Sequence, residues 1–395
     1  MNRLFREARL EFGERFDGEP AGYARAPGCV NLLGDHTEHF GGQALPVAVD
    51  MSAVLAFRPN DSNTVRIHSV YLDRTDFFDI AELQCGDEVH WLDYVKGVAD
   101  LADQDWELKP NGFDAVLAGN LPVEAGLGAS SALTVAAALT YLHLAGEERD
   151  PVDIARLCQK AETEFVGVHC DLIAPAASVL GQAGMAFKLD CHSLEVNFVP
   201  MIPADCTLVV CDSRIRADDS LNEILSRRDQ CREGVRKIAK FVRGREIQTV
   251  RDLSLRDFNL YGPMLQPPVR ERVKHIVTEN QRVDECADSM ADRNIVRAGV
   301  LLDASHNSLR DDYGVSCKEI DLLVEIAWNT RMVFGARMAG QGFGGVTVNL
   351  VEPEGVANFC NTITRQYRAR TELTPNVYVC QPDKGAELLT TEELK

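Results

Sequence analysis

Small, flexible residues gather in residues 121–132 (LPVEAGLGASSA), where two glycines and two serines lead directly into an apolar run of helix length. The first N–H groups of a helix are unpaired and partly positive, and glycine lets the backbone approach a phosphate closely. The segment therefore predicts phosphate binding, with Ser130 or Ser131 as a possible Mg²⁺ ligand. The alternative is a glycine turn that only caps a buried helix. No GK[ST] follows, so this is not a Walker A motif.

A second glycine cluster, residues 340–345 (GQGFGG), formally matches GxGxxG. That dinucleotide-binding fingerprint follows a strand and opens a helix. Here an alternating run at residues 346–351 (VTVNLV) comes next and predicts a strand. We therefore reject a dinucleotide site and expect a tight turn that approaches a ligand or another backbone segment.

Polar groups crowd into residues 26–42 (APGCVNLLGDHTEHFGG), which contain Asp35, His36, Glu38 and His39. This density predicts a polar ligand, because a carboxylate can accept hydrogen bonds from two hydroxyl groups. The HxxH spacing also raises zinc as an alternative, although the segment offers no clear third ligand. A solvated turn is the third interpretation.

The elements that must position these residues are helices and strands in a mixed order. The apolar run of residues 131–145 predicts a helix that ends at Gly146. Asp150 and Pro151 then start another helix, as N-cap and first helical residue. Glu162 lies beside the apolar stripe of that helix rather than within it. Short β-rich runs separate the helices, so we expect an α+β protein.

Length and composition limit the class of protein. The 395 residues exceed what one core usually serves, so we expect two domains, residues 1–200 and 201–395. The formal charge of −19 would repel nucleic acid and anionic lipid, so we expect neither as a partner. No run reaches the roughly 18–20 apolar residues of a membrane span, and the N-terminus lacks a signal core. The twelve cysteines lie singly, which predicts reduced thiols and a cytoplasmic location.

Taken together, the three glycine-containing segments resemble the three signature motifs of the GHMP kinases, in the same order and spacing. Residues 26–42 resemble the galactokinase pattern APGRVNLIGEHTDYNGG, and the similarity continues through residues 90–98, 159–167, 189–195 and 227–231. The resemblance implies a two-domain GHMP kinase fold of the α+β class. Its N-terminal domain is ribosomal-protein-S5-domain-2-like, its C-terminal domain is ferredoxin-like, and its active site lies in the cleft between them.

The resemblance also implies a kinase that uses ATP and Mg²⁺ on a small sugar or polyol, and we expect a monomer or a homodimer. The residues that the family uses on the nucleotide side are all present. They are Trp91 for the adenine pocket, Gly126, Leu127, Gly128, Ala129, Ser130 and Ser131 for the ATP phosphates, Ser130 and Glu162 for Mg²⁺, and Gly340 and Gly342 for the turn over the transferred phosphate.

The sugar side departs from the family pattern. Cys29 stands where the motif has its catalytic Arg, and Ala174 stands where it has its catalytic Asp. His36 is unchanged, whereas an Ile replaces the usual sugar-stacking Tyr. The residues at the substrate-binding positions are Asp35, His36, Glu38, Cys170, Asp171 and Ile224.

Three functions are compatible with these departures. The first is a sugar kinase that forms a sugar 1-phosphate, with Asp171 as a substitute general base whose pKa is raised by partial burial. For this residue a helix N-cap is the alternative role. The second is a catalytically impaired homologue that binds ATP or sugar as a sensor or regulator. The third is a kinase of a different polyol, amino sugar or cyclitol.

Overall fold

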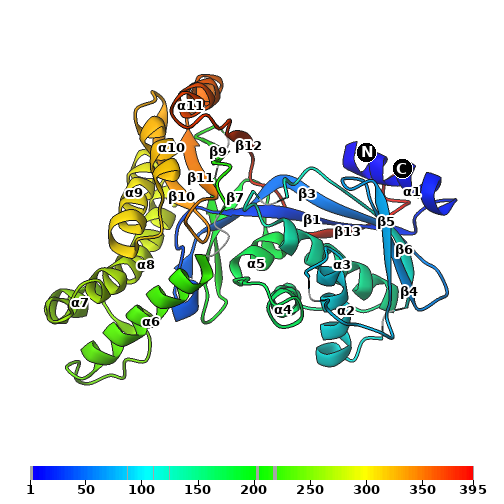
Figure 1. The fold of residues 1–395 in the computed structure, drawn as a ribbon, viewed down its shortest axis with the longest axis horizontal. Coiled ribbons are helices and arrows are strands. Elements are labelled where there is room, and N and C mark those ends of the chain that lie inside the picture. The colour runs from blue at the N-terminus through cyan, green and yellow to red at the C-terminus, as the bar shows by residue number, and fades with distance from the viewer. Residues whose placement is uncertain are drawn as a thin grey trace. The chain divides into compact units, whose positions relative to one another are not determined.

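The computed structural model describes residues 3–86, 88–109, 111–123, 125–201, 204–216 and 220–394 (Figure 1). The chain forms two compact units, each with its own sheet and core. Unit 1 consists of Met1–Cys29, Ala48–Ala183 and Asp383–Lys395, and unit 2 consists of Val30–Val47 and Gly184–Pro382.

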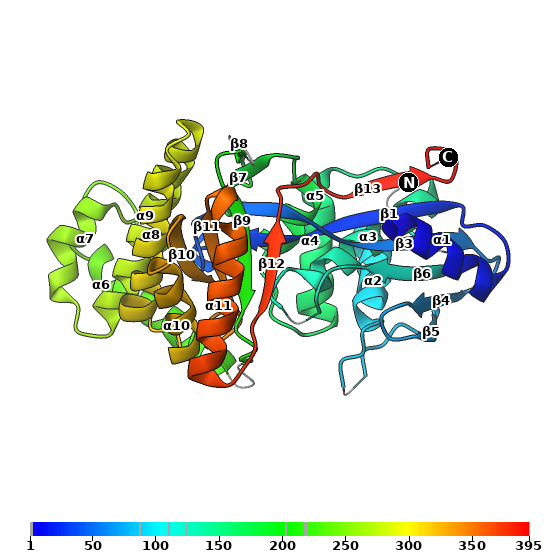
Figure 2. The same ribbon diagram turned by 90° about the horizontal axis from the view of Figure 1, so that it is seen from above.

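Unit 1 is built on a six-stranded sheet with the strand order β13-β1-β3-β6-β4-β5. β4 pairs with β6 in parallel, whereas β1 with β13, β3 with β6 and β4 with β5 are antiparallel. The last strand of the chain thus lies beside the first one (Figure 2). The strands are β1 (Gly22–Asn31), β3 (Pro46–Pro59), β4 (Thr64–Ser69), β5 (Arg74–Asp79), β6 (Phe113–Gly119) and β13 (Glu387–Thr390).

Helices cover both faces of this sheet, because its central strands are apolar on both sides. Along β3, Leu55 and Phe57 belong to the core under α2, α3 and α4, whereas Val54 and Ala56 pack with α1. The helices of unit 1 are α1 (Arg3–Phe16), α2 (Asp93–Trp106), α3 (Ala129–Ala145), α4 (Pro151–Lys160), the π-helix η2 (Ala161–Phe165) and α5 (Ile173–Leu180).

The predicted helix boundaries in unit 1 are confirmed where a local signal sets them. α3 ends at Gly146, which has a left-handed φ of 69°. The Asp150 carboxylate caps α4 by accepting the Val152 N–H at 2.8 Å. α3 begins at Ala129, slightly earlier than predicted, because the left-handed Gly128 (φ 72°) turns the chain there.

Unit 2 contains a four-stranded antiparallel sheet, β10-β11-β9-β12, and a three-stranded antiparallel sheet, β2-β7-β8. β11 starts directly after the glycine cluster of residues 340–345, as predicted. The strands are β2 (Gln43–Ala44), β7 (Met185–Asp190), β8 (Val196–Pro200), β9 (Thr207–Asp212), β10 (Val333–Ala339), β11 (Val346–Val351) and β12 (Asn376–Cys380).

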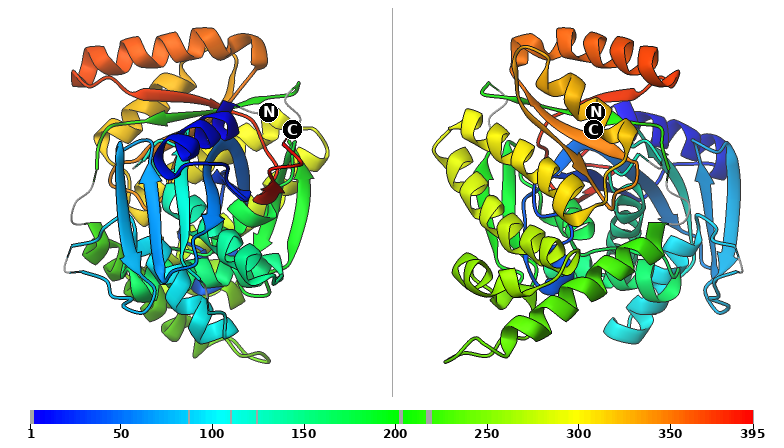
Figure 3. Two further views of the ribbon diagram at one scale, coloured as in Figure 1. Left: turned by 90° about the vertical axis from the view of Figure 1, so that its right-hand side faces the viewer. Right: turned by 60° about the vertical axis from the view of Figure 1, so that its left-hand side comes forward.

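The helices of unit 2 form two packed groups. α10 and α11 bury their apolar faces on the four-stranded sheet (Figure 3), whereas α6, α8 and the π-helix η5 share a second core. The α- and π-helices are α6 (Ser220–Ala239), α7 (Leu255–Tyr261), α8 (Val269–Ala291), α9 (Ile295–Asn307), η5 (Ser308–Tyr313), α10 (Lys318–Trp328) and α11 (Val356–Thr371). The short 3₁₀ helices are η1 (Glu38–Phe40), η3 (Val250–Asp252), η4 (Gly262–Met264) and η6 (Pro353–Gly355).

Two further observations concern the cysteines and the helices. None of the twelve cysteines, all of which lie within the described ranges, forms a disulfide bond. No helix in the described part of the chain has the length and apolar character that a membrane crossing requires.

Candidate active site

A pocket of about 610 Å³ in unit 1 joins the predicted adenine and phosphate sites. Trp91, just before α2, lines one part of the pocket, and the backbone around Gly128 lines another. The Trp91 indole is held in place because its Nε1–H donates to Asp76 Oδ2 at 2.8 Å. Such a mostly apolar hollow fits a planar base. The predicted ATP residues that line it are Trp91, Gly126, Gly128, Ala129 and Ser130.

The phosphate loop, which comprises the predicted phosphate-binding residues 126–131, leads into the first turn of α3, so unpaired N–H groups of that turn are available at this pocket. Leu127 and Ser131, the other two predicted ATP residues of unit 1, are buried and do not line the pocket. Gly128 is needed for two reasons. Its φ is 72°, and a Cβ atom there would lie 3.1 Å from the Cys29 sulfur.

The predicted Mg²⁺ ligand Glu162 lies in η2 and is only 2% exposed. The Ser131 hydroxyl donates to Glu162 Oε1 at 2.9 Å, and the Thr134 hydroxyl donates to the same oxygen at 3.3 Å. Burial raises the pKa of the Glu162 carboxyl, and hydrogen bonds from Ser130 and Ser131 oppose this shift. A buried carboxylate surrounded by neutral hydroxyls fits a hard divalent cation, so Ser130 and Glu162 suit Mg²⁺.

Cys29 and Ala174 stand where the resemblance predicts a catalytic Arg and a catalytic Asp, and both lie at the same loop. The Cys29 N–H donates to Leu127 O at 3.0 Å, and a Cβ atom on Gly128 would lie 3.8 Å from the Ala174 Cβ. The Cys29 thiol is neutral, because burial and then the carboxylate of Asp171 raise its pKa. Unit 1 therefore presents two small, uncharged groups beside the phosphate loop.

Asp171 acts as the cap of α5. Its Oδ1 accepts the N–H groups of Ile173 at 2.8 Å and Ala174 at 3.3 Å. This is the capping role that the sequence offered as the alternative to a catalytic base, and the two roles are compatible because the second carboxylate oxygen differs from the capping one. The thiol of the predicted substrate residue Cys170 lies 3.8 Å from the Ser131 hydroxyl.

In unit 2, Asp35 links the first motif, residues 26–42, to the third motif, residues 340–345. Its Oδ1 accepts from Asn31 Nδ2 at 2.6 Å, and its Oδ2 accepts from the Arg337 guanidinium and from the Gly340 N–H at 3.1 Å. The third motif is a tight turn that approaches another backbone segment, as predicted. A Cβ atom on Gly342 would lie 2.6 Å from Val315 O.

The other polar residues of the first motif are also buried. His36 has a left-handed φ of 66°, and burial lowers its pKa to about 3, so the ring is neutral. Burial opposes the ionisation of Glu38, but the adjacent His39 outweighs it and lowers the Glu38 pKa to about 2. His39 Nε2 lies 2.6 Å from Glu38 Oε1. The described ranges contain no group of three or more His, Cys, Asp or Glu residues arranged to hold a metal ion.

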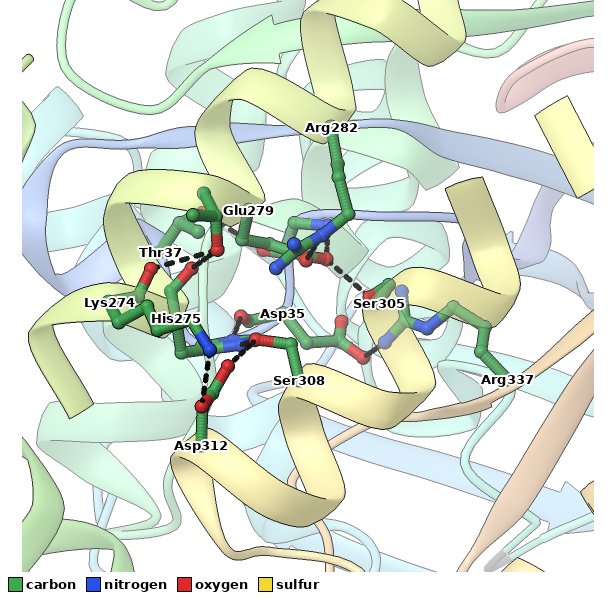
Figure 4. Close-up of polar contacts among 12 residues, drawn as sticks. Asp35, Thr37, Lys274, His275, Glu279, Arg282, Ser305, Ser308, Asp312 and Arg337 are labelled. Atoms are coloured by element: carbon green, nitrogen blue, oxygen red, sulfur yellow. Dashed lines mark hydrogen bonds and ion pairs between the residues drawn. The ribbon is translucent and has the colours of Figure 1, made fainter. Parts of the chain in front are cut away.

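A buried polar network contacts the first motif (Figure 4). Glu279 accepts the Gly34 N–H at 3.0 Å, the Ser305 hydroxyl at 2.7 Å and the Arg282 guanidinium at 2.6 Å. His275 contacts Asp35 O at 3.3 Å. The sequence interpretation missed these residues. Glu279 and Arg282 carry opposite charges three positions apart on an amphipathic helix, and this was the one local signal available.

The last predicted substrate residue, Ile224, is fully buried on α6. It lies one helical turn before Arg228, whose charge acts on His36 and on Tyr313. The α6 position that the family pattern gives to a Tyr is therefore apolar in this chain.

Comparison with known proteins places this arrangement in a family. The chain matches the family model for the GHMP kinases N terminal domain over residues 93–182, and the model for the galactokinase galactose-binding signature over residues 10–59. The galactokinase of Chloroflexus aggregans is 38% identical over 387 residues, which are 96% of this chain and 97% of that protein. The chain belongs to the galactokinase family.

Further galactokinase-family relatives agree along the whole chain. The galactokinase of Chloroflexus aurantiacus is 37% identical and covers 97% of both chains. The crystal structure of Lactococcus lactis galactokinase complexed with galactose matches with a TM-score of 0.88 at 27% identity, over 96% of this chain and 98% of that one. Methanococcus jannaschii mevalonate kinase, with a TM-score of 0.65 over 91% of this chain and 98% of its own, is only 15% identical and shares the fold. The predicted GHMP kinase fold of the α+β class is confirmed.

Proposed function

We propose that this chain transfers the γ-phosphoryl group of ATP to a hydroxyl group of a small sugar and forms a sugar 1-phosphate. As a member of the galactokinase family, it is a phosphotransferase that acts on a sugar. The observation that carries the proposal is the pocket of about 610 Å³ that runs from Trp91 to the phosphate loop, with the buried Glu162 carboxylate hydrogen-bonded to that loop.

The residues of unit 1 account for nucleotide binding. Trp91 would contact the adenine, and the N–H groups at the start of α3 would bind the phosphates. Ser130 and Glu162 would hold Mg²⁺, which neutralises charge on the phosphate oxygens. The Ser131 hydroxyl keeps Glu162 in place through its 2.9 Å hydrogen bond.

Transfer remains feasible without the usual catalytic pair. The transition state of phosphoryl transfer is loose, so positioning and electrostatic stabilisation supply most of the catalysis. We assign the remaining proton-acceptor role to Asp171, since its charge already acts on Cys29 beside the phosphate loop. Gly342 would contribute a backbone N–H group near the transferred phosphate, whereas Gly340 would hold this turn in place through its N–H bond to Asp35 Oδ2 at 3.1 Å.

Unit 2 supplies the proposed sugar contacts, chiefly His36 and Glu38. Asp35 already accepts hydrogen bonds on both oxygens, so we assign it mainly to holding the first motif on Arg337 and Gly340. We also propose that units 1 and 2 correspond to the N-terminal and C-terminal domains of the family, with the first motif in unit 2.

Two observations favour an acceptor other than galactose. Compared with the family pattern, the phosphate loop lacks one positive charge at Cys29 and one negative charge at Ala174. At Ile224 the chain lacks the aromatic ring and hydroxyl group of a Tyr. Asp171 and Glu162 leave this side of the loop acidic around the neutral thiol of Cys29. A polyol, a cyclitol or an amino sugar with a protonated amine would suit such a field, and galactose should be a weak acceptor.

The same substitutions favour a second function, an ATP- or sugar-binding regulator that does not turn over. A panel assay of ADP release separates the two, with galactose, glucose, galactosamine, N-acetylgalactosamine and myo-inositol as acceptors. We expect one acceptor to raise ADP release well above the rate with ATP alone. ATP binding without any acceptor-dependent release would support the regulator and refute the kinase.

A further inference from the structure

Tyr313, at the end of η5, lies between two buried imidazoles of unit 2. Its ring centroid is 4.6 Å from that of His36, at an interplanar angle of 30°, and 4.8 Å from that of His275, at 39°. Tyr313 and His275 are fully buried and His36 is 4% exposed. The Tyr313 ring thus contacts both imidazoles at tilted angles, and one of them, His36, is a proposed sugar contact.

Contacts other than these ring contacts fix the backbone of Tyr313. Arg227 on α6 donates to Tyr313 O at 3.0 Å and to Gly314 O at 2.8 Å, where the end of η5 leaves carbonyl groups without helical partners. The Arg227 guanidinium also lies over the Phe343 ring at 5.1 Å. The Tyr313 backbone is therefore held in place, and its buried ring contacts the His36 ring.

The second imidazole, His275, is held by hydrogen bonds at both ring nitrogens. His275 Nε2 donates to Asp35 O at 3.3 Å, and Nδ1 contacts the Ser308 hydroxyl at 2.9 Å. Since residue 35 directly precedes His36, the His275 contact to Asp35 O helps to fix the backbone next to His36 (Figure 4).

Two buried polar atoms of the first motif indicate a ligand. His36 Nε2 has no hydrogen-bond partner within the described ranges, and the same holds for Glu38 Oε2. Buried polar atoms are normally paired, because an unpaired one loses its hydrogen bonds to water and destabilises the fold. His36 also has a left-handed φ of 66°, which is uncommon for a residue other than glycine.

We infer that Tyr313 is a positioning residue for the acceptor sugar: its ring holds the His36 imidazole so that Nε2 meets a sugar hydroxyl group. The inference rests on the proposed sugar kinase function and adds a residue to it. If Tyr313 only filled the core, its loss would lower stability without a selective effect on the sugar.

The test compares Tyr313→Leu, which removes the ring, with Tyr313→Phe, which keeps it. Tyr261→Leu is the control, because the Tyr261 ring in the same unit stacks on Phe241, at 6.1 Å and 25°, and not on His36. We expect Tyr313→Leu to raise the KM for the best acceptor of the panel about tenfold or more, with the KM for ATP changed less than about twofold. Tyr313→Phe and Tyr261→Leu should stay within about threefold of the parent chain for both.

An NMR titration of the unmodified chain provides a readout that needs neither turnover nor a folded Leu variant. The His36 Cε1–H signal, assigned from its loss in His36→Gln, should shift when galactose or the best acceptor is added to saturation. If calorimetry shows that the sugar binds but the His36 signal does not shift, the inference is wrong, whereas the proposed kinase function is unaffected. A tenfold KM increase in Tyr313→Phe would overturn it too, since the hydroxyl and not the ring would then be responsible. If no sugar binds or reacts, the proposed function fails, and this inference fails with it.

Discussion

The Cys29 thiol lies directly against Gly128 of the phosphate loop, so close that a Cβ atom on the glycine would meet the sulfur at 3.1 Å. The family pattern has an Arg at position 29. In this chain the small, neutral thiol of Cys29 occupies that position. The loop packs against it, and the Cys29 N–H donates to Leu127 O at 3.0 Å. The departure from the pattern is therefore accommodated by the loop that would bind the phosphates.

Gly128→Ala should weaken ATP binding, because the added methyl group both meets the Cys29 sulfur and disfavours the φ of 72°. We expect the KM for ATP to rise about tenfold. Gly146→Ala is the matched control: it lies at the other end of α3 with a φ of 69° and nothing within 4 Å of the added atom. An equal effect of the two substitutions on ATP would contradict a specific role of the Gly128 contact.

Glu162→Gln should make the metal-free chain more stable and abolish stabilisation by MgATP. Burial raises the pKa of this carboxyl, so its ionised form costs free energy at neutral pH, and the neutral amide removes that cost. Thermal melts with and without MgATP measure both effects. Glu164→Gln, at an exposed position of the same π-helix, should change neither. An undiminished MgATP shift in Glu162→Gln would rule out Glu162 as a Mg²⁺ ligand.

Asp171→Asn should leave the melting temperature unchanged and lower turnover. The Asn oxygen can still accept the Ile173 N–H that Asp171 accepts at 2.8 Å, so the cap of α5 survives while the base is lost. A general base contributes about 10²–10⁴-fold, so we expect a loss of at least tenfold. Asp150→Asn repeats the exchange at the cap of α4, where no change in turnover is expected. If turnover stays within about threefold of that of the parent chain, Asp171 is a capping residue and not the general base.

The buried imidazoles predict a loss of stability in mild acid. Burial lowers the pKa of His275 to about 4 and that of His36 to about 3, below the unfolded value of about 6.5. As pH falls below about 6.5, the unfolded chain binds protons that the folded chain cannot, which costs about 1.4 kcal/mol per pH unit for each ring.

His275→Gln removes one of these two contributions. Between about pH 7 and about pH 5, its free energy of unfolding should therefore fall by roughly 2 kcal/mol less than that of the parent chain. Urea unfolding at the two pH values measures this, with the exposed His192→Gln as control. The same pH dependence in His275→Gln and the parent would show that His275 is not held neutral by burial.

Sequence reasoning succeeded where the cause is local. Gly146 ends α3 and Asp150 caps α4 through contacts within a few residues, and the β11 alternation follows the third motif directly. Residues that gain their role from distant partners were not predictable. Asp35 looked available for a ligand, yet its partner Arg337 is 302 positions away, and the Gly34 contact to Glu279 spans 245 positions. A single sequence carries no signal for such pairs.

Phosphorus-31 NMR of ATP, Mg²⁺ and the best acceptor tests the central claim most directly, because it observes the transferred group itself. The account predicts that the parent chain produces a sugar phosphate ester signal in step with the appearance of ADP, and that Glu162→Gln produces none. The contradictory result is a chain that MgATP stabilises but that forms no phosphate ester with any acceptor of the panel, which would make it a nucleotide-binding regulator.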